Sequence, residues 1–299
     1  MKNRKDYLLR FMRSYDYPEA AVQTVLWAWD AVCADPVSAK RMREALTVYE
    51  ADQLFAYKAQ LEHLVLIAQR TGIPGETVDL LYVMSLTAHL EKLYEVRGLP
   101  HQVYRDSMLD IRCKLLECRQ VRKLWGLSVA YWYERFFLLT RFALGRLQFE
   151  LRRAQEPMER DGHRIETGDL MVNMHIPSSG PLTPEACEDS FRQAYRWYRP
   201  LFPDGIIPFH CYSWLLAPEH ENMLSPDSNI RRFGSFFRIY PTDTPVTGDL
   251  WRVFGMETDD YTLCPRDTAL RRAYGEVLDR GEMPTAGRGL FFMKDEQPL

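Results

Sequence analysis

Residues 171–184 read MVNMHIPSSGPLTP, an apolar strand that leads into a Ser/Gly/Pro turn and then into a helix that begins with proline. Thr183 is a favoured helix N-cap, and Pro184 suits the first helical position. The first turn of a helix presents unpaired backbone N–H groups and a partial positive charge. The segment is therefore a candidate loop for a phosphate or pyrophosphate. The alternative is a well-capped helix start without a ligand, and Glu185 in its first turn would oppose a bound anion.

Strand and helix patterns alternate on both sides of this segment. Residues 145–152, GRLQFELR, alternate apolar and polar side chains, which predicts a half-buried strand. Further strands are predicted at 169–176, 207–216, 235–241, 249–255 and 288–293, and helices at 184–199, 226–233 and 266–279. This interleaving predicts a mixed β-sheet flanked by helices in the second half of the chain.

The first half of the chain has helical periodicity instead. Apolar residues follow helical spacing from Thr77 until Gly98 ends the helix, and residues 104–125 repeat the pattern with charged side chains on the other faces. The composition changes near residue 126. We therefore predict an α+β protein with an α-helical N-terminal domain at residues 1–126 and a mixed-sheet C-terminal domain at residues 127–299.

Composition argues against several functional classes. The chain of 299 residues has a formal net charge of −3, and its charges are interspersed, so no nucleic-acid partner is expected. No apolar run approaches the ~20 residues that cross a bilayer, and the first residues do not resemble a signal peptide. We expect a cytoplasmic protein with no membrane partner. Six scattered cysteines without a CxxC pair predict free, mostly buried thiols and no metal site.

Two predicted strands carry histidines. On strand 169–176, Asn173 and His175 face the same side because side chains alternate along a strand. A histidine there is a candidate general base, and the alternative is a hydrogen-bonded histidine that fixes the following loop. On strand 207–216, His210 and Tyr212 share one face. They are candidates for a functional site, or they pack under a helix with their polar tips satisfied.

Other side chains in these segments are weaker candidates. Cys211 and Ser213 face the side opposite to His210, and no nucleophile elbow surrounds Ser213. Gln148 and Glu150 project together from strand 145–152, where Glu150 is either a catalytic base or a partner of nearby arginines. Glu134 lies among aromatic residues and either lines a pocket or forms a buried ion pair.

Six short strings resemble a bacterial family described as acyltransferase domain-containing, in which an all-helical N-terminal domain precedes a C-terminal domain like that of the GNAT-type acyltransferases. The strings are ERFF (134–137), LGRLQFE (144–150), HIPSSGPLTPEAC (175–187), CYSWLL (211–216), SNIRRF (228–233) and GRGLFF (287–292). The resemblance covers the whole chain, with its most specific motifs within residues 128–292. It implies an acyltransferase whose co-substrate is acetyl-CoA or another acyl-CoA and whose acceptor is an amine or a hydroxyl compound.

The resemblance also implies a location for the cofactor. The GNAT pyrophosphate loop typically reads Q/R-x-x-G-x-G/A, and the matching loop here supplies Ser178, Ser179, Gly180, Leu182 and Thr183 as cofactor-binding candidates. This loop has one glycine, and Pro181 lacks a backbone N–H. The competing hypothesis is a non-catalytic module that keeps the GNAT scaffold to sense a ligand or bind a protein.

Catalytic roles follow from the same resemblance. GNAT sheets splay between the strand before the cofactor loop and the strand after the next helix, so His175 and His210 would flank one cleft as an acid/base pair. Glu150 is the second candidate base, acting through water. The helical domain would form part of the acceptor pocket, and its size favours a bulky acceptor or an oligomer interface, such as that of a homodimer. The pocket candidates are Glu134, Gln148, Asn173, Tyr212 and Ser213.

Overall fold

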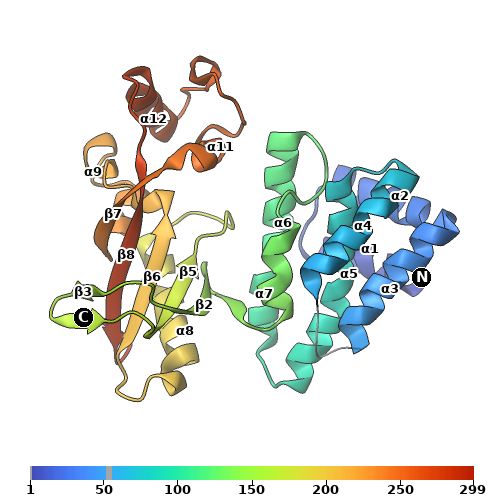
Figure 1. Ribbon diagram of the computed structural model, residues 1–299, viewed down its shortest axis with the longest axis horizontal. Coiled ribbons are helices and arrows are strands. Elements are labelled where there is room, and N and C mark those ends of the chain that lie inside the picture. The colour runs from blue at the N-terminus through green and yellow to red at the C-terminus, as the bar shows by residue number, and fades with distance from the viewer. Residues whose placement is uncertain (1, 52–55) are drawn as a thin grey trace. The chain divides into compact units, whose positions relative to one another are not determined.

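The computed structural model describes residues 2–51 and 56–299, and the chain forms two compact units, Met1–Thr140 and Arg141–Leu299 (Figure 1). The sequence places the change of composition near residue 126, whereas the units divide at Thr140. The aromatic segment 130–137 explains the difference, because it packs onto the helices. The Tyr57 hydroxyl donates to the Ala130 carbonyl at 2.7 Å, and the Tyr49 hydroxyl donates to the Phe137 carbonyl at 2.9 Å.

The first unit is helical, as predicted. Helix α5 lies at its centre: it contacts α1, α2, α3, α4 and α6 and buries residues on most of its circumference. A helix that is apolar on most sides requires such a central position. The elements are α1 (Lys2–Ser14), α2 (Glu19–Ala34), α3 (Pro36–Ala51), α4 (Tyr57–Thr71), α5 (Gly75–Val96), α6 (His101–Arg122), η1 (Ala130–Tyr133) and α7 (Glu134–Phe137).

The second unit contains a mixed sheet flanked by helices, which confirms the α+β class. The strands are β1 (Arg141–Leu144), β2 (Leu147–Arg153), β5 (Leu170–His175), β6 (Ile207–Ser213), β7 (Arg238–Pro245), β8 (Thr285–Lys294) and β9 (Gln297–Pro298). Their order is β1-β2-β5-β6-β8-β7, with β9 paired to β8. Only β5 and β6 pair in parallel among the described strands. The connections carry α8 (Pro184–Tyr198), η2 (Arg199–Leu201), η3 (Trp214–Leu216), α9 (His220–Met223), α10 (Asn229–Gly234), η5 (Tyr261–Leu263) and α12 (Ala269–Asp279).

One predicted strand is wrong. Residues 249–255 form the end of η4 (Val246–Asp249) and the helix α11 (Leu250–Phe254), which ends at Gly255 in the left-handed conformation. Leu250, Val253 and Phe254 are buried in one apolar cluster with Tyr274 of α12. Their spacing of three and four residues is helical. Because the segment is so short, its packing against Tyr274 decides between helix and strand.

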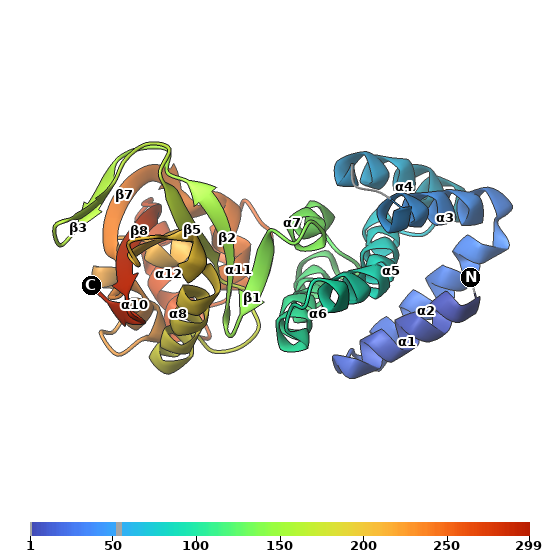
Figure 2. The ribbon, with the colours of Figure 1, turned by 90° about the horizontal axis from the view of Figure 1, so that it is seen from below.

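The two faces of the sheet have different coverings (Figure 2). Phe191 of α8 contacts Phe209 and Phe291 on one face, with ring centroids 6.3 and 4.8 Å apart. The opposite face is covered by a hairpin of β3 (Met158–Arg160) and β4 (His163–Ile165), whose apolar side chains pack with Met171, Leu290 and Phe292. The sequence analysis missed this hairpin, although its Asp-Gly turn at residues 161 and 162 is a hairpin signal.

Candidate active site

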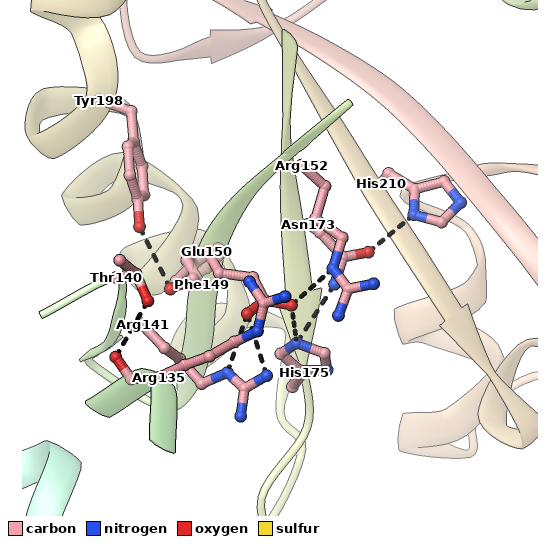
Figure 3. A network of polar contacts seen from close by, with 10 residues as sticks. All are labelled: Arg135, Thr140, Arg141, Phe149, Glu150, Arg152, Asn173, His175, Tyr198 and His210. Carbon is pink, nitrogen blue, oxygen red and sulfur yellow. Dashed lines mark hydrogen bonds and ion pairs between the residues drawn. The ribbon is translucent and has the colours of Figure 1, made fainter. Parts of the chain in front are cut away.

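A row of polar side chains crosses four strands of the sheet on the face away from α8. Arg141 of β1 lies opposite Glu150 of β2, Glu150 lies opposite Asn173 of β5, and Asn173 lies opposite His210 of β6. Side chains on one face of neighbouring strands are about 5 Å apart. The strand register therefore brings together residues that are far apart in the sequence (Figure 3).

Glu150 is the buried anchor of this row. Its side chain is fully buried, and Arg141 Nη2 donates to Oε2 at 2.9 Å while Arg152 Nε donates to Oε1 at 2.7 Å. His175 Nε2 lies 3.0 Å from Oε1. Burial would raise the pKa of Glu150, but the His175 hydrogen bond and the charge of Arg141 outweigh burial and hold this pKa below its usual range. Glu150 is therefore ionised at neutral pH.

His175 connects the buried carboxylate to the solvent side. Its side chain is 20% exposed, whereas that of Glu150 is not exposed at all. An ionised carboxylate only accepts hydrogen bonds, so Nε2 of His175 carries the ring proton and Nδ1 carries the lone pair. Burial lowers the pKa of His175 and the hydrogen bond to Glu150 opposes that shift, with a net lowering. The ring is neutral at pH 7 and can accept a proton.

Asn173 lies between the two histidines. Its Oδ1 accepts from His210 Nδ1 at 2.8 Å, and its Nδ2 is 3.2 Å from His175 Nε2. Burial, followed by the charge of Arg152, lowers the pKa of His210 to about 4. His210 is therefore neutral at pH 7 and has no imidazolium proton to donate, and its place beside Asn173 makes it a positioning group; the acid role expected from the sequence stays a prediction.

A cavity of about 480 Å³ opens on this face. Asn173, His175, His210 and Tyr212 line it, as do the apolar side chains of Met158 and Met171. Tyr212 is 48% exposed, which leaves its ring accessible from the cavity. The structure thus gathers four of the predicted site residues in one place, with Glu150 behind them in the sheet.

The pairing of the two parallel strands ends beside this cavity. Pairing between β5 and β6 runs from Val172–Phe209 to Met174–Cys211 and then ends, although β6 continues to Ser213 along β8. His175 is the residue of β5 directly after the last pair. The splay expected between the two histidine-bearing strands stays a prediction, because β5 itself ends at His175.

The loop after β5 is built as the sequence predicts. The backbone N–H of Ala186 donates to Thr183 Oγ1 at 3.3 Å, and Pro184 opens α8. Arg146, in the turn between β1 and β2, reaches this loop: Nη2 donates to the Gly180 carbonyl at 2.7 Å and Nε to the Pro181 carbonyl at 3.2 Å. From the sequence, Arg146 is expected as a polar strand residue and a possible partner of Glu150, whereas its link to the loop depends on tertiary structure.

The other cofactor candidates differ in exposure. Ser178 and Gly180 are exposed, Ser179 is partly exposed, and the Leu182 side chain is buried, so Leu182 would contribute through its backbone. The helix N-terminus and the Arg146 guanidinium at this loop fit a phosphate group.

Three pocket candidates do not line the cavity. Gln148 is buried on β2 opposite His175. Ser213 Oγ accepts from the Leu215 backbone N–H at 3.1 Å and caps η3. Glu134 belongs to the helical unit, where it begins α7.

Within residues 2–51 and 56–299, no three His, Cys, Asp or Glu side chains are grouped so that they could hold a metal ion. None of the helices in this part of the chain combines the length and apolar content that a bilayer crossing requires. All six cysteines are free, and all but Cys33 are buried.

Comparisons with known proteins agree with this fold. A family model described as GNAT-like C-terminal domain matches residues 141–291, and one described as N-acyltransferase N-terminal domain matches residues 6–139. A crystal structure of an acyltransferase in complex with decanoyl-CoA and teicoplanin aligns with a TM-score of 0.71 at 19% identity, covering 95% of this chain and 86% of that one. A mutant acyltransferase in complex with octanoyl-CoA aligns with a TM-score of 0.70 at 20% identity and the same coverage.

No curated protein matches. The chain belongs to the family of proteins with a GNAT-like C-terminal domain.

Proposed function

We propose that the protein transfers an acyl group from an acyl-CoA to an amine or hydroxyl acceptor bound in the cavity beside β5 and β6. The observation that carries this proposal is the position of His175, which lines the cavity, ends β5 and directly precedes the loop to α8. The family and the acyl-CoA complexes of the structural neighbours support it.

The coenzyme A end of the substrate would lie at the loop and the N-terminus of α8. Pro184 has no N–H and the N–H of Ala186 donates to Thr183, so the pyrophosphate would be bound by the Glu185 backbone N–H, the positive end of the α8 dipole and the Arg146 guanidinium. The loop has a single glycine where the Q/R-x-x-G-x-G/A pattern has up to two, and Pro181 lacks an N–H, so Arg146 would supply part of the binding that backbone N–H groups supply in the usual loop.

The chemical step requires one proton acceptor. The acceptor nitrogen or oxygen attacks the thioester carbonyl, the C–S bond breaks, and the thiolate of coenzyme A leaves. His175 takes the proton of the attacking group on Nδ1, and the Glu150 carboxylate at Nε2 stabilises the imidazolium that forms. Arg141 and Arg152 keep Glu150 ionised for this role.

The test combines binding and turnover. Octanoyl-CoA should raise the melting temperature of the protein by mass action, and free thiol should appear when amines are added. Unchanged melting at millimolar octanoyl-CoA would contradict the proposal. A raised melting temperature without thiol release for any acceptor would instead favour the non-catalytic binding module.

Two further expectations accompany this proposal. A cytoplasmic location and a possible homodimer remain predictions from the sequence. Light scattering after size-exclusion chromatography measures the mass in solution, and a value near 35.1 kDa would exclude a stable dimer.

A further inference from the structure

We propose that a second, smaller cavity, the aromatic hollow within residues 246–264, binds a small organic cation with an alkylated ammonium group. The hollow has a volume of about 240 Å³, and the aromatic side chains of Trp251, Phe254 and Tyr261 line it. None of its lining residues also lines the cavity beside His175. The inference therefore goes beyond the proposed function and does not rest on it.

The aromatic hollow belongs to a long insertion between two neighbouring strands. β7 ends at Pro245, and its antiparallel neighbour β8 begins at Thr285. A hairpin connection needs only about two to five residues, whereas here the connection forms η4, α11, η5 and α12 around a buried cluster of its own. The insertion lies at the edge of the sheet where β6 ends, because Ser213 pairs with Gly287 near the start of β8 (Figure 1). The sheet does not require this segment, so the segment can carry a separate site.

The walls of the hollow are suited to a cation. Trp251 and Phe254 are three residues apart on α11 and lie on the same side of that helix, and Tyr261 comes from η5. Phe254 is buried, whereas Trp251 and Tyr261 are partly exposed. The face of an aromatic ring attracts a cation, that of tryptophan most strongly, and groups of aromatic rings bind quaternary ammonium ligands.

The charges around the hollow have the matching sign. Glu257 and Asp259 contribute carboxylates to its lining, and no lysine, arginine or histidine of the described residues contributes to it. Asp259 is exposed and forms no hydrogen bond or ion pair within the described parts of the chain. This carboxylate would repel an anion and attract a cation.

Arg252 shows that the indole ring of Trp251 already attracts one cation. The guanidinium carbon lies 4.2 Å from the ring centroid, and Nε donates to Asp249 Oδ1 at 3.0 Å. Arg252 does not line the hollow, so its guanidinium does not fill it. Residues 246–264 contain four acidic side chains against this one arginine. Their net negative charge favours a second cation in the hollow.

The volume of the hollow limits the size of the ligand. Pockets for whole small molecules begin at ~300 Å³, and the hollow is smaller, at about 240 Å³. It therefore fits one compact group, such as trimethylammonium, and not a complete acyl acceptor.

The experiment compares choline with neohexanol, an uncharged compound of the same shape in which carbon replaces the nitrogen of choline. Each probe is titrated with the full chain, and ligand-observed NMR follows its methyl signal. The wild-type protein should bind choline about tenfold more tightly than neohexanol. Equal binding of the two probes, or no binding of choline, would overturn the proposal.

Variants assign this charge preference to the residues. Trp251→Leu should abolish the preference, whereas Trp251→Phe, which keeps an aromatic ring, should retain part of it. Asp259→Asn should reduce the preference about two- to fivefold, the effect of one exposed charge. Because Asp259 is exposed, this variant keeps its fold and tests the site even if Trp251→Leu does not fold.

Two exposed positions of the helical unit provide matched controls. Trp27→Leu on α2 and Asp6→Asn on α1 remove the same kinds of side chain and should keep the wild-type preference. A full preference in Trp251→Leu or in Asp259→Asn would contradict the assignment, and so would its loss in either control.

These probes need neither acyl-CoA nor turnover. A preference for choline without thiol release from any acyl-CoA would leave the cation site standing and refute the proposed function. Thiol release without a preference for choline would do the reverse.

Discussion

His175 Nε2 lies 3.0 Å from Glu150 Oε1, and this single contact links a partly exposed imidazole to a fully buried carboxylate. The contact fixes which ring nitrogen carries the proton. It also places an ionised group where it stabilises the charge that a general base acquires.

Glu150→Gln should lower kcat/KM by about 10² to 10⁴, because the amide cannot stabilise the imidazolium form of His175. Glu150 raises the pKa of His175 by hydrogen bonding and by its charge. The acid limb of the pH–rate profile should therefore move to lower pH in the variant. Steady-state kinetics across pH measure both effects, and an acid limb that does not move would show that Glu150 acts only in packing.

The wild-type pH profile should reflect the lowered pKa of His175. Burial lowers this pKa from 6.5, so the neutral, proton-accepting ring persists below pH 6.5 and is lost as the pH falls through the lowered value. The measurement is kcat/KM between pH 4.5 and 8.5. An acid limb centred above pH 6.5 would contradict His175 as the base in this environment.

Arg146→Gln should weaken acyl-CoA binding by about tenfold, the effect of losing about 1.4 kcal/mol. The side chain holds the carbonyls of Gly180 and Pro181 and brings positive charge to the loop. Octanoyl-CoA and S-octanoyl pantetheine, which lacks the pyrophosphate, are the matched ligands. The variant should lose affinity for octanoyl-CoA and keep its affinity for S-octanoyl pantetheine. An equal loss for both ligands would contradict a role of Arg146 in binding the pyrophosphate.

Gly287→Ala should destabilise the sheet unit by about 1 to 3 kcal/mol, the range for overpacked cores. A Cβ at Gly287 would lie 2.0 Å from the Leu216 carbonyl oxygen. This oxygen belongs to the backbone, so it cannot move away as the end of a flexible side chain could. Gly248→Ala is the control, because nothing lies within 4 Å of its added Cβ. Melting temperatures measure the difference, and equal values for the two variants would contradict this close approach of η3 to β8.

Much of the site follows from local sequence patterns. Alternation along a strand predicts that Asn173 and His175 face one side, and that His210 and Tyr212 share another strand face. The N-cap at Thr183 follows from residue preference. The hydrogen bonds of the polar row do not follow in this way, because they require the order and register of β1, β2, β5 and β6. Because it depends on the same register, the contact of Glu150 with Arg141 and with His175 is also not predicted from the sequence, which suggests only a base that acts through water.

Tertiary contacts also explain what the sequence patterns miss. Residues 250–254 form an apolar run interrupted once by Arg252, which is too short for its periodicity to decide between strand and helix, and burial beside α12 selects the helix. Arg146 comes directly before a strand, and nothing in its local sequence indicates that its guanidinium reaches the loop 30 or more residues later.

The central claim, that His175 is the base of an acyl transfer, is tested most directly by comparing His175→Gln with the wild type under single-turnover conditions. The protein is saturated with octanoyl-CoA, and thiol release after addition of the acceptor is measured beside the dissociation constant of octanoyl-CoA. His101→Gln, at an exposed histidine on α6, is the control. We predict an unchanged dissociation constant and a rate about 10² to 10⁴ lower in His175→Gln alone. A wild-type rate in His175→Gln would contradict the claim.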